Sequence, residues 1–411
     1  MASVFVYHVV GDLTVGKPEL IEFCETETVE SAIKAIGESS EGGIPVWRNK
    51  FNKNIIENSE MRLQRFVGVL NPLDIVAFLA KDWCLEDQEK ALKTPVSQIV
   101  VPNNSLLKEV DPATRLIDAL DMMKQGVKRL LVPKSIGWKC VSKKFSVLYN
   151  GRWLKNIETG NNSNNLANLS LPSSSSNTDY IKTAKFCCLS REDIVRFLIG
   201  CLGALAPVPL SSISSLGAIN PDYTTIEASV PAIESTRTLP VDPVTIAVVE
   251  PTPDGQHKII GEISACKLWK CDYLAAAYAL AKLSAGQFVM GVEDNVTPRH
   301  IPNIGGGITQ TNGAKESGSG KLRRKFSSRS IGFFSNPISP TMGHVRSMYR
   351  GRSAPLTCKV TSSLAAVMAQ MLSHRATHVW VTEGEDDVLV GIVGYREILH
   401  AVTRPASLNN G

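Results

Sequence analysis

The chain has 411 residues, of which 43% are hydrophobic and 20% charged, so it is long enough for two or three globular domains with ordinary cores. Its formal net charge is only +5, and eight of its basic residues lie between Lys321 and Arg352, a stretch without an acidic residue. The rest of the chain is therefore mildly acidic, which excludes the broad basic face expected of a nucleic-acid-binding protein.

From the N-terminus and the cysteines we expect an intracellular protein. The N-terminal segment has no basic region and becomes acidic early, so we expect no signal or transit peptide and a cytoplasmic location. The nine cysteines are odd in number and are not spaced as zinc ligands, so we expect reduced thiols and no metal site. The most apolar run, residues 194–210, contains Arg196, two glycines and two prolines and is shorter than the roughly 20 residues of a membrane span. We expect a buried helix there, followed by a turn.

The first predicted unit, residues 15–80, begins with an amphipathic helix. Four apolar residues share one helical face, namely Val29, Ala32, Ile33 and Ile36. The apolar segments 43–47 and 65–70 then predict two strands, separated by a longer loop at 49–64. Pro72 suits the first turn of a second helix because it has no N–H group to satisfy.

The second unit, residues 94–202, repeats this order. A helix over 114–123 precedes apolar strands over 128–133 and 185–190, and the latter leads directly into a further helix. An insert rich in Asn and Ser at 156–180 is expected to be disordered.

The third unit, residues 205–283, is degenerate. Pro231 and a lack of apolar residues at helical spacing predict a short first helix. Strands are expected over 245–251 and 258–263, and the second strand is expected to lead directly into a helix.

The fourth unit, residues 353–404, has the clearest pattern. Its first helix is expected over 361–372, a strand over 378–382, and a strand followed directly by a helix over 388–402. The linker before it, 293–350, is Gly-rich at its start and basic later, and we expect it to be disordered.

This fourfold order of helix, strand, strand and helix resembles the cystathionine-β-synthase (CBS) domain, and the chain resembles plant-type proteins that consist only of CBS repeats. The resemblance implies an α/β fold of the α+β type, with four CBS repeats paired into two Bateman modules at about 1–202 and 205–405. Pairing buries the apolar sheet face that one repeat would expose, so an even number of repeats is expected.

In the CBS family the cleft between paired repeats often holds an adenosine nucleotide, which implies candidate binding residues here. A carboxylate near the start of the second helix can accept hydrogen bonds from the ribose. A hydroxyl three residues earlier can donate to a phosphate, helped by free N–H groups of the helix N-terminus. The second repeat has both groups, Ser190 and Asp193, whereas the first keeps Asp74 but has Asn71 at the hydroxyl position.

The C-terminal repeats depart from this pattern. In the third repeat Lys267 stands where the acid belongs, three residues after Ser264, and in the fourth Gly394 replaces the hydroxyl before Glu397. We therefore expect the N-terminal module to bind AMP, ATP or S-adenosylmethionine, and the C-terminal module to bind poorly.

The resemblance implies further contacts. Lys128 and Arg129 precede a strand of the second repeat, and His374 and Arg375 follow a helix of the fourth, where the family contacts phosphate. Thr114, at the start of a predicted helix, is also expected to reach the cleft.

Each candidate also has a purely structural interpretation. Ser190 and Thr114 suit helix N-caps, and both aspartates suit a first helical turn, where a negative charge meets the positive end of the helix dipole. Lys128 and Arg129 suit the charged edge of a strand.

The sequence lacks the catalytic motifs of common enzyme classes, including G-x-S-x-G, the P-loop lysine and H-E-x-x-H, so we expect no enzymatic activity. Two functions stay open. One is a regulatory protein that senses an adenosine nucleotide and modulates a partner protein that the sequence does not name. The other is a ligand-free scaffold for homodimerisation and partner binding.

The basic linker contains two candidate phosphorylation sites. Arg324 lies three residues before Ser327, and Arg350 lies three before Ser353, a spacing that resembles the sites of basophilic kinases. A phosphate would reduce the dense positive charge and add a strong acceptor. The alternative is a linker that is only basic and solvated.

Overall fold

The computed structural model describes most of the chain, namely residues 4–39, 42–50, 59–134, 147–149, 152–154, 185–269, 271–290, 354–384 and 387–404. The insert at 156–180, the linker at 293–350 and the candidate phosphorylation sites Ser327 and Ser353 lie outside these residues.

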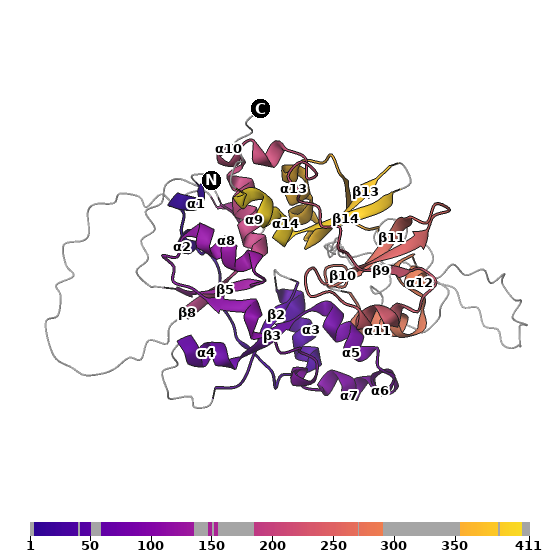
Figure 1. Cartoon of the computed structure of the whole chain (residues 1–411). Helices are drawn as coiled ribbons and strands as arrows, with labels where there is room; N and C mark the ends of the chain where they lie inside the picture. The colour runs from indigo at the N-terminus through magenta and orange to yellow at the C-terminus, as the bar shows by residue number, and fades with distance from the viewer. Residues whose placement is uncertain are drawn as a thin grey trace, which may run out of the picture.

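Four units repeat one order of elements, a short strand, a helix, two longer strands and a helix (Figure 1). Unit 1 consists of β1 (Phe23–Cys24), α3 (Val29–Glu38), β2 (Ile44–Trp47), β3 (Phe66–Leu70) and α5 (Pro72–Leu79). Unit 2 consists of β4 (Leu107–Glu109), α8 (Leu116–Lys124), β5 (Arg129–Lys134), β8 (Lys185–Ser190) and α9 (Arg191–Gly200).

Unit 3 consists of β9 (Thr225–Glu227), η4 (Ala232–Arg237), β10 (Thr245–Pro251), β11 (His257–Ser264) and α11 (Tyr273–Lys282). Unit 4 consists of β12 (Thr357–Lys359), α13 (Leu364–His374), β13 (His378–Glu383), β14 (Val388–Gly394) and α14 (Tyr395–Thr403). The remaining helices are α1 (Val4–Tyr7), α2 (Val10–Leu13), α4 (Ser59–Arg65), α6 (Asp82–Glu86), α7 (Gln88–Lys93), η1 (Val96–Gln98), η2 (Asn104–Leu106), α10 (Leu202–Leu205), η3 (Val208–Leu210) and α12 (Ala285–Met290). The remaining strands are β6 (Val147–Tyr149) and β7 (Arg152–Leu154).

The sheet of every unit has the same topology. The short first strand pairs parallel with the second, and the second pairs antiparallel with the third. The first helix connects the two parallel strands, which is why it follows the first strand in each unit. The sequence pattern does not reveal the first strands, because each has only two or three residues.

The units pair through their sheets into two modules. Units 1 and 2 meet through a buried cluster made of Trp47, Phe66, Leu106, Leu107, Leu131 and Phe186. In units 3 and 4, β11 pairs with β14, so that one six-stranded sheet runs through both. The predicted pairing of four CBS repeats into two Bateman modules is therefore correct, and we call units 1 and 2 the N-terminal module and units 3 and 4 the C-terminal module.

Helices join the two modules. Figure 1 shows α11 beside α5, and α13 and α14 beside α9 and α8. The buried side chains form one cluster shared by units 1 and 3 and another shared by units 2 and 4. All four units therefore pack around a common centre.

The structure corrects one predicted transition. The strand predicted over 258–263 is present as β11, but eight residues separate its end at Ser264 from the start of α11 at Tyr273. In the other units an acid at the third helical position bonds back to the N-cap N–H and closes the turn. Lys267 cannot do this, since a cation is unfavourable at a helix N-terminus, and α11 begins at the new N-cap Asp272 instead. The short first helix predicted from Pro231 is confirmed as η4.

The apolar run at 194–210 is broken into α9, α10 and η3. Among the described residues no helix has the length and apolarity that crossing a bilayer requires. The cysteines in the described part of the chain are free thiols.

Candidate ligand-binding pocket

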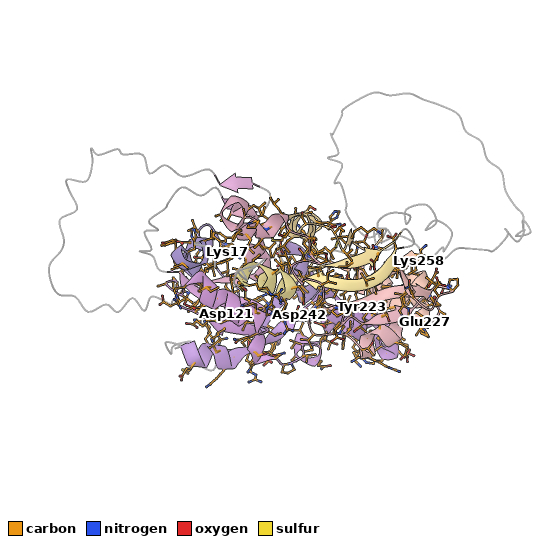
Figure 2. The ribbon with its side chains drawn as sticks, turned by 45° about the horizontal axis from the view of Figure 1, so that its top comes forward. Lys17, Asp121, Tyr223, Glu227, Asp242 and Lys258 are labelled. Carbon is orange, nitrogen blue, oxygen red and sulfur yellow. The ribbon has the colours of Figure 1, made fainter. Side chains whose placement is uncertain are left out.

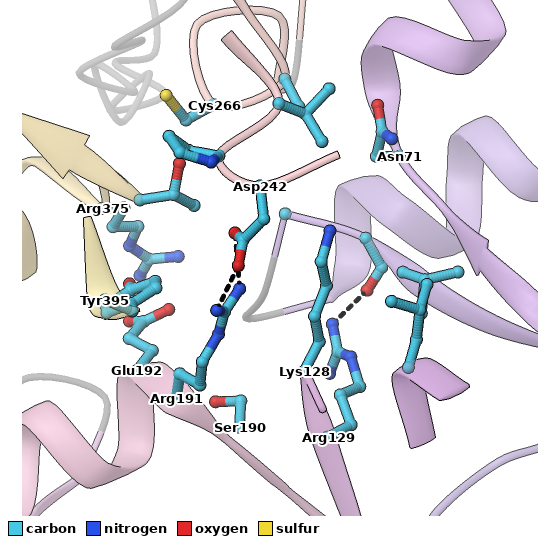
Figure 3. Close-up of a pocket in the computed structure, with 18 of the residues that line it drawn as sticks. Asn71, Lys128, Arg129, Ser190, Arg191, Glu192, Asp242, Cys266, Arg375 and Tyr395 are labelled. Carbon is cyan, nitrogen blue, oxygen red and sulfur yellow. Dashed lines mark hydrogen bonds and ion pairs between the residues drawn. The ribbon is translucent and has the colours of Figure 1, made fainter. Parts of the chain in front are cut away.

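A pocket opens at the centre, where the four units meet (Figure 3). Its empty space, with the open mouth included, is about 1040 Å³. Its polar and aromatic lining comes from all four units: Asn71 of unit 1, Lys128, Arg129, Ser190, Arg191 and Glu192 of unit 2, Asp242, Cys266 and Trp269 of unit 3, and Arg375, Thr377 and Tyr395 of unit 4.

Unit 2 supplies a compact basic cluster. Arg129 begins β5 and lies opposite Ser190, which ends β8, in the antiparallel pairing of the two strands. Lys128 comes directly before Arg129, and Arg191 comes directly after Ser190. The pairing of β5 with β8 therefore brings three cations and a hydroxyl together. The structure thus gathers the predicted residues Lys128, Arg129 and Ser190 at one pocket, and adds Arg191, which the sequence analysis did not single out.

Ser190 lines the pocket but is also a helix cap. Its hydroxyl accepts a hydrogen bond from the N–H of Asp193 at 3.3 Å and donates to the carboxylate of Asp193 at 2.9 Å. The N-cap interpretation of Ser190 is therefore confirmed.

Asp193 does not line the pocket. Its carboxylate accepts the backbone N–H of Ser190 at 2.8 Å and forms an ion pair with the ammonium group of Lys17. The side chains of Lys17 and Asp193 are only 7% and 10% exposed, so the pair is largely buried. The carboxylate of Asp193, which was predicted to bind a ribose, is therefore already bonded to groups of the N-terminal module.

Asp74 likewise bonds to its own helix terminus, where its carboxylate accepts the N–H of Asn71 at 3.0 Å. Burial raises the pKa of Asp74 to about 6, although the bonds to Asn71 and the charge of Lys128 lower it. Asn71 lines the pocket, and Asp74 is not among the lining residues.

Thr114 lies outside the pocket lining. Its backbone carbonyl accepts the N–H of Val10 at 2.9 Å, which attaches the N-terminal segment to unit 2. The N-cap interpretation of Thr114 is wrong, because α8 begins one residue later and its N-cap is Arg115.

The cations of the pocket have neighbours in other units. Arg129 donates to the carbonyl of Gly43 at 2.9 Å, and Lys128 donates to the carbonyl of Val241 at 2.7 Å. Burial lowers the pKa of Lys128, and the carboxylate of Asp242 opposes this effect. An additional negative charge beside this ammonium group would therefore be favoured.

Arg191 binds a carboxylate of unit 3 through two hydrogen bonds. Its guanidinium donates two hydrogen bonds, of 2.5 and 2.8 Å, to the carboxylate of Asp242 (Figure 3). The sequence carries no signal for this pair, because Asp242 lies between Pro240 and Pro243, outside any apolar pattern, and belongs to the other module.

On the opposite wall, Arg375 is the C-cap residue of α13 and has the left-handed conformation, with φ 52°. Its guanidinium lies over the ring of Trp269, 4.8 Å from the ring centroid. Of the two residues predicted at the cleft, Arg375 lines the pocket and His374 does not.

The C-terminal module fills its own interior with a polar network. Glu262 accepts bonds from His378 at 2.9 Å and Trp380 at 2.5 Å, and the ammonium group of Lys267 lies 3.8 Å away. Burial alone would raise the pKa of Glu262, but the charges of His378 and Lys267 and the hydrogen bonds from His378 and Trp380 together outweigh it and lower the pKa to about 2. Ser264 also donates to Glu262, so these predicted positions serve the network.

Comparisons with known proteins agree with this architecture. The CBS domain family model matches residues 346–404. The CBS domain-containing protein CBSX6 of Arabidopsis thaliana is 66% identical over 417 residues, which cover 99% of this chain and 96% of the relative. The SNF1-related protein kinase regulatory subunit gamma-like PV42b of the same plant is 22% identical, over 97% of this chain and 95% of its own length.

Among solved structures, protein MJ1225 from Methanocaldococcus jannaschii, described as a putative archaeal homolog of g-AMPK, matches with a TM-score of 0.49 and 12% identity, over 95% of this chain and 98% of its own. The identity of 66% over nearly the whole length decides the matter: the chain belongs to the plant family of CBS domain-containing proteins.

Proposed function

We propose that the chain is a non-catalytic regulatory protein that binds an adenosine nucleotide in the central pocket and modulates a partner protein. The observation that carries the proposal is the basic cluster of Lys128, Arg129 and Arg191 in a pocket lined by all four units. Partly buried cations attract phosphate strongly, because little water screens the interaction.

The same cluster supports a choice among the ligands. AMP and ATP carry phosphates, whereas S-adenosylmethionine carries a positive sulfonium group beside its amino-acid charges. We therefore favour AMP or ATP, with Lys128, Arg129 and Ser190 on the phosphate side. Asp74 and Asp193 can serve the ribose only by giving up their present bonds to Asn71 and Lys17.

A ligand in this pocket would touch both modules at once and so favour one arrangement of the two over others. PV42b is named as a kinase regulatory subunit gamma-like protein, which supports a protein kinase as the class of partner. The alternative, a ligand-free scaffold, needs no binding in the pocket.

Isothermal titration calorimetry of the full chain with AMP, ATP and S-adenosylmethionine tests the proposal. We expect AMP or ATP to bind, and Lys128→Met to weaken that binding about tenfold, since a charged hydrogen bond contributes about 1.5–3 kcal/mol. Lys108→Met removes the same charge from an exposed position on β4 and serves as the control. No heat with any of the three at millimolar concentration would leave only the scaffold function.

A further inference from the structure

The loop between η4 and β10, residues 238–244, extends from the C-terminal module to the basic cluster of the N-terminal module. Its Val241 carbonyl accepts a bond from Lys128, and its Asp242 carboxylate accepts two from Arg191. Figure 2 places Asp242 near the middle of the molecule, between Lys17 on one side and Glu227 on the other. One loop thus holds two of the pocket's cations.

The contact between Asp242 and Arg191 has the geometry of anion recognition. The two parallel hydrogen bonds of a guanidinium suit two oxygens of a carboxylate or of a phosphate equally well. The Arg191 side chain is 7% exposed and that of Asp242 is 26% exposed, so the pair is shielded from water on the arginine side. Burial opposes ionisation of Asp242, but the Arg191 guanidinium outweighs it and holds the pKa of Asp242 below its usual value.

Asp242 therefore stands where two phosphate oxygens would bind Arg191. We propose that Asp242 is an internal competitor for the phosphate of the pocket's ligand, and that a phosphate which binds Arg191 releases loop 238–244 from the N-terminal module. This inference rests on the proposed function, and it names how occupancy of the pocket would be transmitted between the modules.

The inference also restricts the ligand. A group that replaces Asp242 must offer two anionic oxygens to one guanidinium, as a phosphate does. Adenosine has no such group and would leave the loop in place. The pocket should therefore couple to the loop only when the ligand carries a phosphate.

Calorimetry on the full chain tests this with Asp242→Asn, which keeps an acceptor oxygen but removes the charge. We expect the variant to bind AMP at least about tenfold more tightly than the wild type, because Arg191 no longer has an ionic partner. Binding of adenosine should be equal in the two proteins. Asp254→Asn removes one charge from an exposed turn of the same unit and should change neither affinity.

Hydrogen exchange of the wild type gives a second reading that does not depend on the folding of the variant. The backbone amides of Thr245 and Ala265 donate to the carbonyls of Pro243 and Val244 in this loop, at 2.9 and 3.3 Å. They should exchange faster with AMP and at an unchanged rate with adenosine, because release of the loop breaks these bonds.

The outcomes separate the two proposals. If the wild type binds AMP but neither the affinity of Asp242→Asn nor the exchange of the loop changes as stated, the competitor role of Asp242 is wrong and the nucleotide function stands. If only Asp242→Asn binds AMP, the competitor role stands and sensing by the wild type fails. If neither protein binds AMP, ATP or S-adenosylmethionine, both proposals fall.

Discussion

The carboxyl group of Asp74 shows how burial of a single residue affects stability. Its pKa is raised by burial from 3.8 to about 6, so the folded state binds the proton more tightly than the unfolded state. The contribution of Asp74 to the free energy of unfolding should therefore be largest below about pH 4 and should fall as the pH rises through 6, by about 3 kcal/mol.

Asp74→Asn removes this titration while its side-chain oxygen can still accept the N–H of Asn71. Chemical denaturation of wild type and variant between pH 4 and 8 should show a difference in unfolding free energy that changes in favour of the variant as the pH rises. Parallel pH profiles of the two proteins would mean that Asp74 titrates at its ordinary value in the folded state.

At the scale of the strand, a glycine in the third strand of a unit has a packing role. In units 1, 3 and 4 the third strand has a glycine, Gly68, Gly261 and Gly391, next to an irregularity in its pairing with the second strand. A Cβ at Gly68 would lie 2.6 Å from the carbonyl oxygen of Val101. The connecting segment can therefore lie directly on the strand only because the side chain is absent.

Gly68→Ala should lower the free energy of unfolding by about 1–3 kcal/mol, because the backbone of Val101 must move. Gly37→Ala is a matched control in the same unit, since nothing lies within 4 Å of a Cβ at this helical position. We expect Gly37→Ala to be neutral or to stabilise by up to about 1 kcal/mol. Equal effects of the two substitutions on urea unfolding would argue against the packing role.

These elements also show what the sequence can predict. The helices of units 1, 2 and 4 and the second and third strand of each unit were predictable, because each carries its own apolar period or run. The start of α11 was not, since it depends on the loss of a capping acid at Lys267 and the presence of a later cap at Asp272. The short first strands contain too few residues for any alternation.

Some residues of the candidate pocket could likewise be predicted from the sequence, and others could not. Lys128, Arg129 and Ser190 were predicted from the resemblance to the CBS family, and the structure shows that they lie at the paired ends of two strands in one unit. Asp242 and Trp269 come from the other module, and their position depends on how the modules pack. The bond of Lys17 to Asp193 also joins distant parts of the chain, so the sequence did not indicate that this carboxylate is already occupied.

At the scale of the whole molecule, two kinds of contact meet at the pocket. Sheets join the units within each module, and helices join the modules to each other. A ligand at the centre would contact both modules and so report on their arrangement, whereas a ligand near Asp193 would contact the N-terminal module at a largely buried ion pair.

A crystal structure of the full chain grown with AMP tests the central claim most directly. We predict AMP in the pocket between the four units, with its phosphate within hydrogen-bonding distance of Arg191 or Lys128 and with the carboxylate of Asp242 withdrawn from Arg191. AMP bound elsewhere, or a pocket without AMP at a saturating concentration and with the Arg191–Asp242 pair intact, would contradict the account.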